Sequence, residues 1–459
     1  MDKSTGNKIS RRRSLTLIGT GAASLIGTSL LTRYGWAGTP IGTGTSTVSI
    51  RTHEHFGDIE EQLTFPNTWE LEIMHMKGHG QPGLTSDQIR DKLDRPVGTL
   101  PLREIAAGKK TAVITFDDLT RPTPIKEILP LLVEDLRAAG LKDENILFLA
   151  SYGSHRAMTH AEARVKLGDF IVNNFAWVNH NAWDNLVDVG MTSRGNRIKI
   201  NYLFARADLR ITVSGIKGHN DAGYGGGGKA VLPGCAWIES IDYFHRTITG
   251  LGTNPSVGLA KVFKNDVRLD MEETARLADV NFSVQIVYNE LRQPTEIFAG
   301  DVVNAHHAAC HVANGILRTP MAKDADIVVA NAYPRNRQAH AVQAWARGGL
   351  RDGGSAVIIA QHPDAMSTMH YLNERRYHGG HWYKENLEDD RNTVEQAAQL
   401  IIFSQYMQKR DVDKFSSNNV HLVRSWDEVM TLLQKQHPTD TRVAVYPYAN
   451  IQHPEVDLT

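Results

Sequence analysis

Seven short runs of apolar and β-branched residues constrain the fold of this chain more than any other feature. They cover residues 111–116, 145–150, 209–214, 326–330, 356–360, 420–423 and 442–446. Longer amphipathic stretches separate them, such as residues 125–139, with Pro122 and Pro124 at the start, where a missing N–H is harmless. Apolar runs that alternate with helical patterns are typical of parallel strands joined by helices. The sequence therefore predicts an α/β fold.

The length of the chain, 459 residues with 41% hydrophobic side chains, allows two domains with cores of their own. We expect two α/β domains with mainly parallel sheets and an active-site cleft between them. A helical pattern over residues 297–319 separates two series of strands and helices. We therefore place a cofactor-binding domain at 58–312 and a second domain at 313–440, after a linker at 38–57. The last segment, 441–459, is expected to return to the first domain.

Residues 1–37 have the pattern of a twin-arginine signal peptide. Arg11 and Arg12 precede a mildly apolar run over 15–31, and Gly35 and Ala37 offer small residues to a signal peptidase. The alternative is a membrane anchor, but a run this short and this rich in Gly, Ser and Thr makes a poor span. We expect a protein exported in a folded state by the twin-arginine machinery to the periplasm or another extracytoplasmic space, without stable membrane anchoring.

The charge argues against nucleic acid and anionic membranes as partners, and the cysteine content limits the number of disulfide bonds. The formal net charge is −1, which gives no electrostatic reason to expect nucleic acid or an anionic membrane as a partner. Cys235 and Cys310 are the only cysteines, so at most one disulfide bond is possible. Stability must therefore come from packing.

A glycine-rich loop stands between two histidines. Gly225, Gly226, Gly227 and Gly228 run directly into Lys229. Glycine lets the backbone approach a flat or phosphorylated ligand closely, and a lysine at the end of such a loop can meet a phosphate or form a covalent bond. Taken alone, the pattern equally fits a flexible loop with a solvated lysine.

Polar residues follow three of the predicted strands. Asp118 and Arg121 come after the first, His155 after the second, and His219 with the glycine loop after the third. Ligands of open α/β sheets bind beyond the carboxyl ends of the strands, so these side chains are expected to converge on one crevice. Asp118 as a simple helix cap and His155 as a buried core histidine are the alternatives.

Four motifs together resemble the lactate racemases, a family that uses a nickel-pincer nucleotide. They are Asp118-Leu-Thr-Arg121, Gly-Ser-His155-Arg-Ala-Met-Thr, His219 ten residues before Lys229, and His245 sixteen residues after that lysine. Each spacing alone is unspecific, but their joint occurrence is specific. The flanking sequence from about residue 58 to 452 fits the general pattern of the family.

The resemblance implies a cofactor and the residues that hold it. The nickel-pincer nucleotide, a pyridinium-3-thioamide-5-thiocarboxylic acid mononucleotide that grips nickel, is expected on Lys229 through a covalent bond. His245 matches the nickel ligand, and the glycine loop would let the backbone reach the nucleotide. Because nothing in the chain would make this cofactor, separate cofactor-biosynthesis proteins are implied as partners.

The resemblance also assigns the reaction, the racemisation or epimerisation of a 2-hydroxy acid. His155 and His219 match the two acid/base groups, Arg121 the group that holds the substrate carboxylate, and Asp118 a supporting acidic position. The chemistry agrees, because removal of the α-proton would create a carbanion beside a carboxylate, whereas reversible hydride transfer to the cofactor avoids it. Histidine suits both roles, since its ordinary pKa lies near neutrality.

One part of the chain departs from the family. The family's second domain supplies a glutamine and a lysine to the substrate carboxylate, but an ungapped reading places Ala341 and Ala344 there. The substrate pocket is therefore changed, and lactate itself is in doubt. The nearby candidates for replacement contacts are Arg335, Arg337, His340 and Gln343.

Other histidine-rich segments could also be functional sites. On a helix, His306 with Cys310 and His307 with His311 form i, i+4 pairs that can share a metal, although packing is the expected role. Residues 53–55, His-Glu-His, are expected to be a solvated terminus. Residues 374–382 are expected to form a polar surface loop, with a lid over the pocket as the alternative.

Two further functions remain open from the sequence. A zinc hydrolase would need three protein ligands and an open water position, and it gives Lys229 no role. A periplasmic solute-binding protein also has two α/β domains around a cleft, but it needs neither Lys229 nor paired bases. Nickel, zinc or no metal in the purified protein would separate the three.

Overall fold

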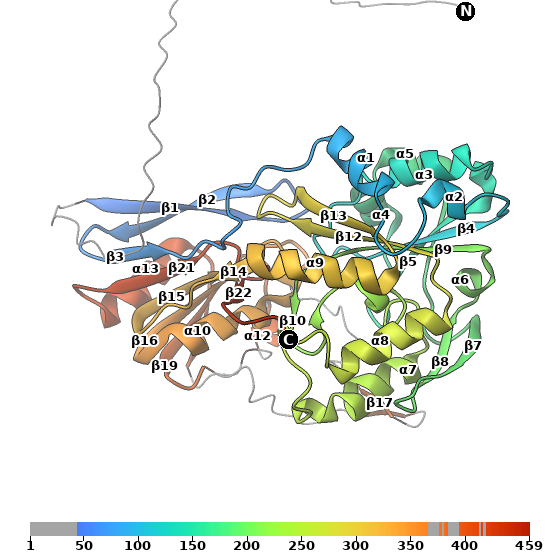
Figure 1. Ribbon diagram of the computed structural model, residues 1–459. Helices are drawn as coiled ribbons and strands as arrows, with labels where there is room; N and C mark the ends of the chain where they lie inside the picture. The colour runs from blue at the N-terminus through green and yellow to red at the C-terminus, as the bar shows by residue number, and fades with distance from the viewer. Residues whose placement is uncertain (1–43, 366–375, 379–380, 384–393, 413–414, 416–418) are drawn as a thin grey trace, which may run out of the picture. The chain divides into compact units, whose positions relative to one another are not determined.

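The computed structural model describes residues 44–365, 376–378, 381–383, 394–412, 415 and 419–459 (Figure 1). Residues 41–459 form one compact unit, built on two six-stranded sheets with helices between their strands. Both sheets are mainly parallel, which confirms the predicted α/β class. The signal segment at 1–37 lies outside the described residues.

The first sheet has the strand order β13-β12-β9-β4-β5-β6. All neighbours in it are parallel except β12 and β13, which pair antiparallel. Its strands are β4 (Ala112–Phe116), β5 (Ile146–Ala150), β6 (Ala176–Asn179), β9 (Leu209–Gly215), β12 (Phe282–Tyr288) and β13 (Pro294–Gly300). The three runs predicted in this half of the chain are therefore its central strands.

Strand β4 explains why these runs are continuously apolar. All five of its residues are buried, and alternate side chains enter different cores. Ile114 and Phe116 pack in the cluster that contains Leu132 of α3 (Leu129–Ala138), whereas Val113 packs with Met271 of α8 (Asp266–Leu277). A parallel strand covered on both faces has no polar side to show.

The helix predicted at 125–139 is shorter than expected. It begins at Leu129, and Pro122 and Pro124 lie in the loop before it rather than in its first turn. That loop is fastened by Lys166 of α4 (His160–Leu167), whose buried ammonium donates to the carbonyls of Arg121 and Thr123 at 2.8 and 3.2 Å. These contacts hold the segment in a non-helical path.

The second sheet is parallel throughout, in the order β20-β19-β16-β15-β21-β3. Its strands are β3 (Glu70–Ile73), β15 (Ala325–Asn331), β16 (Leu350–Ile359), β19 (Ala397–Phe403), β20 (Val420–Val423) and β21 (Arg442–Tyr446). Here β19 was missed by the sequence pattern, and β3 comes from the part of the chain assigned to the first domain.

The N-terminal segment is not the linker predicted at 38–57. Strands β1 (Thr45–Thr52) and β2 (Ile59–Pro66) form an antiparallel hairpin, and Val48 and Ile50 are buried against the second sheet. In β1 the buried residues Val48, Ile50 and Thr52 alternate with exposed or half-buried ones, but only two of them are apolar, so the Thr-rich composition hides the pattern. The histidines and glutamate at 53–55 are likewise no solvated terminus, since His53 and Glu54 are buried.

The ends of the domains also differ from the prediction. Strand β21 pairs with β15 and β3, so the expectation that it returns to the first domain is wrong. The residues after it do contact the first domain: Thr459 accepts from Val262, and Nε2 of His453 lies 3.0 Å from the Tyr224 hydroxyl. In addition, β22 (His453–Pro454) pairs with β14 (Arg318–Thr319). The helical pattern at 297–319 begins as the end of β13, and α9 (Val302–Leu317) follows. The boundary near 312 stays a prediction.

The remaining elements connect or cover the sheets (Figure 1). Among the helices that the structure describes, none is long and apolar enough to cross a membrane. In the 374–382 segment, β17 (Arg376–His378) pairs with β18 (His381–Tyr383), and 374, 375, 379 and 380 lie outside the described residues. The other elements are α1 (Ser86–Asp94), α2 (Leu102–Ile105), α5 (Asp169–Asn174), β7 (Leu186–Met191), β8 (Arg197–Asn201), α6 (Tyr202–Arg206), β10 (Gly218–His219), β11 (Gly223–Tyr224), α7 (Ile238–Tyr243), α10 (Gln343–Gly349), α12 (Lys409–Val412) and α13 (Trp426–Gln436).

Buried Glu54 generates a prediction about stability. Its carboxylate accepts a hydrogen bond from the backbone N–H of Asn336 at 2.7 Å and another from the Asn336 side chain. Burial nevertheless raises the pKa of Glu54 to about 7. A raised carboxyl pKa favours the folded state at low pH, and that contribution is lost as the pH rises from about 4.5 to about 7.

We expect Glu54→Gln to stabilise the protein relative to the wild type by up to about 3 kcal/mol at pH 8, and by much less at pH 5. Urea unfolding at both pH values measures this difference. Glu60→Gln, which removes an exposed carboxylate of the same hairpin, is the matched control and should be nearly neutral at both. A destabilised Glu54→Gln protein at pH 8 would show that the ionised form of Glu54 is needed.

Candidate active site

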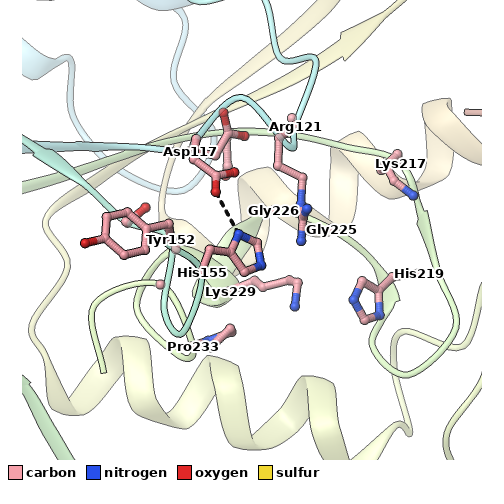
Figure 2. Close-up of a pocket in the computed structure, with 16 residues that line it drawn as sticks. Asp117, Arg121, Tyr152, His155, Lys217, His219, Gly225, Gly226, Lys229 and Pro233 are labelled. Carbon is pink, nitrogen blue, oxygen red and sulfur yellow. Dashed lines mark hydrogen bonds and ion pairs between the residues drawn. The ribbon is translucent and has the colours of Figure 1, made fainter. Parts of the chain in front are cut away.

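A pocket lies beyond the carboxyl ends of β4, β5 and β9 (Figure 2). Because neighbouring parallel strands end at the same edge, the loops after them meet there. The pocket brings together the residues singled out after the three predicted strands, namely Asp118, Arg121, His155, His219, Gly225, Gly226 and Lys229. All the described lining residues come from 117–234. The loops of the first sheet therefore form this pocket, whereas a cleft between the two domains was expected to be lined by both.

His155 and Asp118 form a buried pair. The Nδ1 atom of His155 lies 2.7 Å from an Asp118 carboxylate oxygen, and Asp118 also accepts from the Thr120 hydroxyl at 2.5 Å. Burial would raise the pKa of Asp118, but the charge and hydrogen bond of His155 lower it. Burial lowers the pKa of His155. An ionised Asp118 therefore accepts from Nδ1–H of a neutral imidazole, whose lone pair is then on Nε2.

His219 is set in the opposite tautomer. Its Nδ1 accepts from the backbone N–H groups of Asp221 and Ala222 at 3.1 and 3.2 Å, so the proton of the neutral ring is on Nε2. Burial, followed by the charges of Lys229 and Lys217, lowers the pKa of His219 well below its usual range. One histidine of the pocket thus presents a lone pair and the other an N–H.

The glycine loop is buried rather than exposed, and its glycines have two roles. Gly225 and Gly226 line the pocket. Gly227 and Gly228 pack inward: a Cβ on Gly228 would stand 2.2 Å from the Met271 carbonyl, and one on Gly227 would stand 2.7 Å from the His306 ring. The loop therefore needs glycine for packing as well as for access to a ligand.

Lys229 leaves this loop toward the pocket. Burial, helped by the charges of Arg121 and Arg268, lowers the pKa of its ammonium to about 7. About half of the lysine is then a neutral amine at neutral pH, which is the nucleophilic form. This environment suits covalent attachment of a carbonyl-type group.

Arg268 holds the glycine loop from below. Its side chain is fully buried on α8 and donates to the carbonyls of Ala222, Tyr224 and Gly226. These three carbonyls span the segment that leads to Lys229. The loop that presents the lysine is therefore fixed from its inner side.

Positive charge accumulates around the pocket. Arg121 and Lys217 line it, and Arg335 of the β15–α10 connection contacts the neighbouring Thr120. Burial, followed by the charges of Arg335 and Arg121, lowers the pKa of Lys217 well below its usual range. The site therefore favours anionic ligands.

His245 is not among the described residues that line this pocket. It stands in a π-helical turn, Phe244–Ile248, and its Nδ1 lies 2.8 Å from the carbonyl of Ile241. A carbonyl can only accept, so Nδ1 carries the proton and the lone pair is on Nε2. Metal-binding histidines commonly have this arrangement, and π-turns are frequent at functional sites.

The substrate residues proposed in the second half of the chain, among them His340 and Gln343, are not among the described residues that line the pocket. Gln343 is fully buried and donates to the carbonyl of His340 at 3.2 Å. Arg337 is engaged in ion pairs with Asp364 and Glu162. Arg335, one of the four replacement candidates, contacts the loop that carries Arg121.

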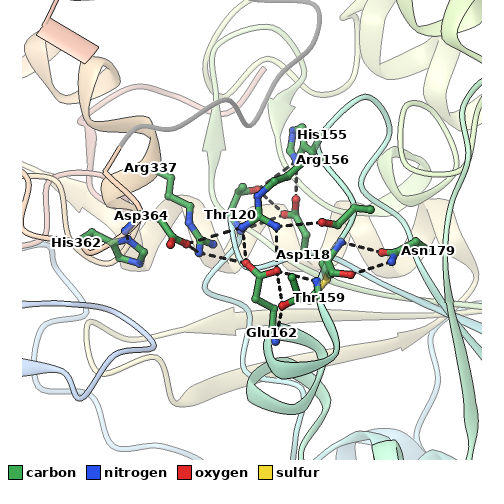
Figure 3. A network of polar contacts seen from close by, with 12 residues as sticks. Asp118, Thr120, His155, Arg156, Thr159, Glu162, Asn179, Arg337, His362 and Asp364 are labelled. Atoms are coloured by element: carbon green, nitrogen blue, oxygen red, sulfur yellow. Dashed lines mark hydrogen bonds and ion pairs between the residues drawn. The ribbon is translucent and has the colours of Figure 1, made fainter. Parts of the chain in front are cut away.

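A network of charges connects the two sheets beside His155 (Figure 3). Arg156, the next residue, pairs with Glu162 at 2.5 Å and lies 3.9 Å from Asp364. Arg337 pairs with the same two acids. The loop that bears His155 is thereby tied to the second sheet.

The histidines of α9 have structural partners. The Nε2 atom of His306 lies 2.9 Å from the carbonyl of Gly225, and His307 pairs with Glu272 at 2.8 Å. The ligand atoms of these two histidines and Glu272 lie within 4.8 Å of one another. Because His306 donates to the glycine loop, its contact supports the loop, in agreement with the expected packing role.

Sequence reasoning missed Lys217, Lys166 and Arg268. Lys217 follows the end of β9, so the same rule that found His219 would have found it. Lys166 and Arg268 act from helices on backbone carbonyls more than 40 residues away in the chain. No local pattern signals such contacts.

Comparison with known proteins identifies the family. A sequence model described as the lactate racemase N-terminal domain matches residues 56–254. The lactate racemase of Thermoanaerobacterium thermosaccharolyticum is 31% identical over 311 residues, which cover 65% of this chain and 69% of that one. The lactate racemase of Lactiplantibacillus plantarum is 33% identical over 311 residues, which cover 66% and 69%.

Solved structures share the fold. The lactate racemase apoprotein from T. thermosaccharolyticum superposes with a TM-score of 0.67 at 24% identity, covering 88% of this chain and 99% of that one. A protein from Thermotoga maritima gives a TM-score of 0.59 at 17% identity, covering 81% and 98%.

The sequence relatives set aside both other functions, the zinc hydrolase and the solute-binding protein. The chain belongs to the lactate racemase family and is a racemase, an isomerase.

Proposed function

We propose that this racemase inverts C2 of a 2-hydroxy acid with a nickel-pincer nucleotide bound to Lys229. The observation that carries the proposal is the shared pocket, in which two histidines of opposite tautomer stand with Arg121 and Lys229. When bound, the cofactor supplies a hydride acceptor, so that the hydrogen on C2 can be removed and returned without a carbanion.

The residues present fit this cofactor. Lys229 has the lowered pKa that attachment through its amine requires, and Gly225 and Gly226 offer backbone to a nucleotide. We propose His245 as the nickel ligand, because its Nδ1–H is held by a carbonyl and leaves Nε2 for the metal. Lys217 adds positive charge for a phosphate.

The proton transfers belong to the histidines. His155 accepts the hydroxyl proton of one enantiomer at Nε2 while Asp118 stabilises the imidazolium that forms. His219 serves the other face, where it has to act as the imidazolium to give a proton, because a neutral ring with its only proton on Nε2 cannot release it. Arg121 neutralises the substrate carboxylate and fixes the orientation of C2. The relatives named lactate racemase make lactate the reference substrate, but Ala341 and Ala344 replace the family's carboxylate contacts, so the proposal names only the class.

The intact mass of the mature protein, expressed with cofactor-making enzymes, tests the proposal. We expect a nucleotide-sized adduct on Lys229, about one nickel per chain, and racemase activity. Lys229→Ala should lose the adduct and the activity. His245→Ala should keep the adduct and lose most of the nickel, since a lost ligand strongly lowers metal affinity. Full activity of Lys229→Ala would refute covalent attachment.

The two-sided chemistry predicts different defects for the two histidines. With 2-deuterated D and L substrates in a single-turnover experiment, His155→Ala and His219→Ala should lose deuterium transfer from opposite enantiomers. Both should lose net inversion, because one base starts the reaction and the other completes it. Equal loss from both enantiomers in both variants would contradict this division of roles.

We also propose export through the twin-arginine route, on the basis of Arg11, Arg12 and the mild apolar run that follows them. Replacement of both arginines by lysine should leave active, cofactor-loaded precursor in the cytoplasm. Fractionation and nickel analysis of cells measure this. Normal delivery of the variant would indicate the general secretory route instead.

A further inference from the structure

Arg335 is a buried cation that forms no ion pair with another described residue. It follows β15, its side chain is 5% exposed, and its Nε donates to the carbonyl of Thr120 at 2.9 Å. None of the ion pairs among the described residues includes it. Burial, followed by the charge of Arg121, lowers the pKa of Arg335 well below its usual range. A guanidinium held in this way is costly unless a ligand supplies negative charge.

The nearby carboxylates are already engaged. Asp118 accepts from His155 and Thr120, and Asp117 pairs with Lys166 at 2.5 Å. Neither acid has an ion pair with Arg335. The charges of Asp118 and Asp117 favour the charged form of Arg335, but their hydrogen bonds and ion pairs go to other groups, so the guanidinium is left able to pair with an anionic ligand.

Arg335 and Arg121 meet at one residue. The Arg121 guanidinium donates to the Thr120 hydroxyl at 2.7 Å, and Arg335 donates to the Thr120 carbonyl. The same hydroxyl donates to Asp118, the partner of His155. Arg121 and Arg335 thus lie beside His155, the proposed base, and each guanidinium can present N–H donors to a carboxylate.

The chemistry of the substrate selects the ligand. In a 2-hydroxy acid the carboxylate and the hydroxyl are on adjacent carbons, so a carboxylate lies within a few ångströms of the base that takes the hydroxyl proton. A phosphate of a nucleotide attached at Lys229 has no such requirement to lie at the Asp118–His155 pair.

We propose that Arg335 binds the substrate carboxylate together with Arg121, and so takes over the role left vacant by Ala341 and Ala344. The inference rests on the proposed function for the identity of the ligand. It also makes Arg335 a determinant of specificity that the second sheet contributes to a pocket lined from the first.

The test compares Arg335→Gln and the charge-conserving Arg335→Lys with a control, Arg351→Gln. Arg351 is an exposed arginine near the start of β16, paired with Asp326 at the start of β15, whereas Arg335 follows the end of β15. Calorimetric titration with glycolate, the smallest 2-hydroxy carboxylate, and with the neutral glycolamide measures binding without cofactor. Thermal unfolding of each variant reports on the fold.

We expect the wild type to bind glycolate at least about tenfold more tightly than glycolamide. Arg335→Gln should weaken glycolate binding by about 10- to 100-fold, leave glycolamide binding unchanged, and raise KM more than it lowers kcat. Arg335→Lys should recover part of the loss, and Arg351→Gln should bind as the wild type does. Glycolate binding within twofold of wild type in Arg335→Gln would overturn the inference, as would equal binding of glycolate and glycolamide by the wild type.

The outcomes separate this inference from the proposed function. A wild-type protein that racemises 2-hydroxy acids, with an Arg335→Gln variant of unchanged KM, would remove Arg335 and keep the reaction. Loss of glycolate binding in Arg335→Gln, with a cofactor-loaded wild type that inverts no 2-hydroxy acid, would keep the carboxylate site and remove the reaction.

Discussion

The parallel pairing of β4 with both β5 and β9 is the constraint on which the active site depends. Parallel neighbours end at one edge, so three loops from distant parts of the chain must meet there. Those loops carry the Asp118–His155 pair, His219 and Lys229. Any change of register between these strands would move the acid/base groups relative to the lysine, whatever the loops themselves contain.

Burial of positive charge is the second constraint. Four basic residues lie at the pocket: Arg121, Lys217 and Lys229 line it, and Arg335 contacts the adjoining Thr120. The acids of the pocket, Asp118 and Asp117, are paired with His155 and Lys166. Such a site is unfavourable in the absence of ligands and becomes favourable when anions enter. The same field lowers the pKa of Lys229, so the feature that attracts the ligands also makes the amine reactive.

The sequence predicted the elements whose side chains are buried on both faces. β4, β5, β9 and β15 are such strands, and their runs could be located within about one residue. β1 could not, because one of its faces is polar and its Thr-rich composition resembles a linker. The strand order was also out of reach: β3 and β21 join the second sheet through pairing that no local pattern encodes.

The same limit applies to the site. Residues that directly follow strands, such as Asp118 and His219, could be assembled from the rule that these loops converge. Arg268 and Lys166 could not, since each acts from a helix on carbonyls that are neighbours only after folding. The tautomer of His155 depends on such a contact, with Asp118, whereas that of His219 is set by the backbone N–H groups of Asp221 and Ala222 close by in the chain.

The contacts of Arg268 have a consequence for the entropy of the proposed cofactor attachment. A run of glycines has more backbone freedom in the unfolded chain than any other sequence. Here one buried guanidinium binds the carbonyl of Gly226 within the run and those of Ala222 and Tyr224 just before it, so much of that freedom is lost when the protein folds. The proposed attachment at Lys229 would then have little backbone left to order, and stiffening of the loop would not reduce the binding free energy of the nucleotide.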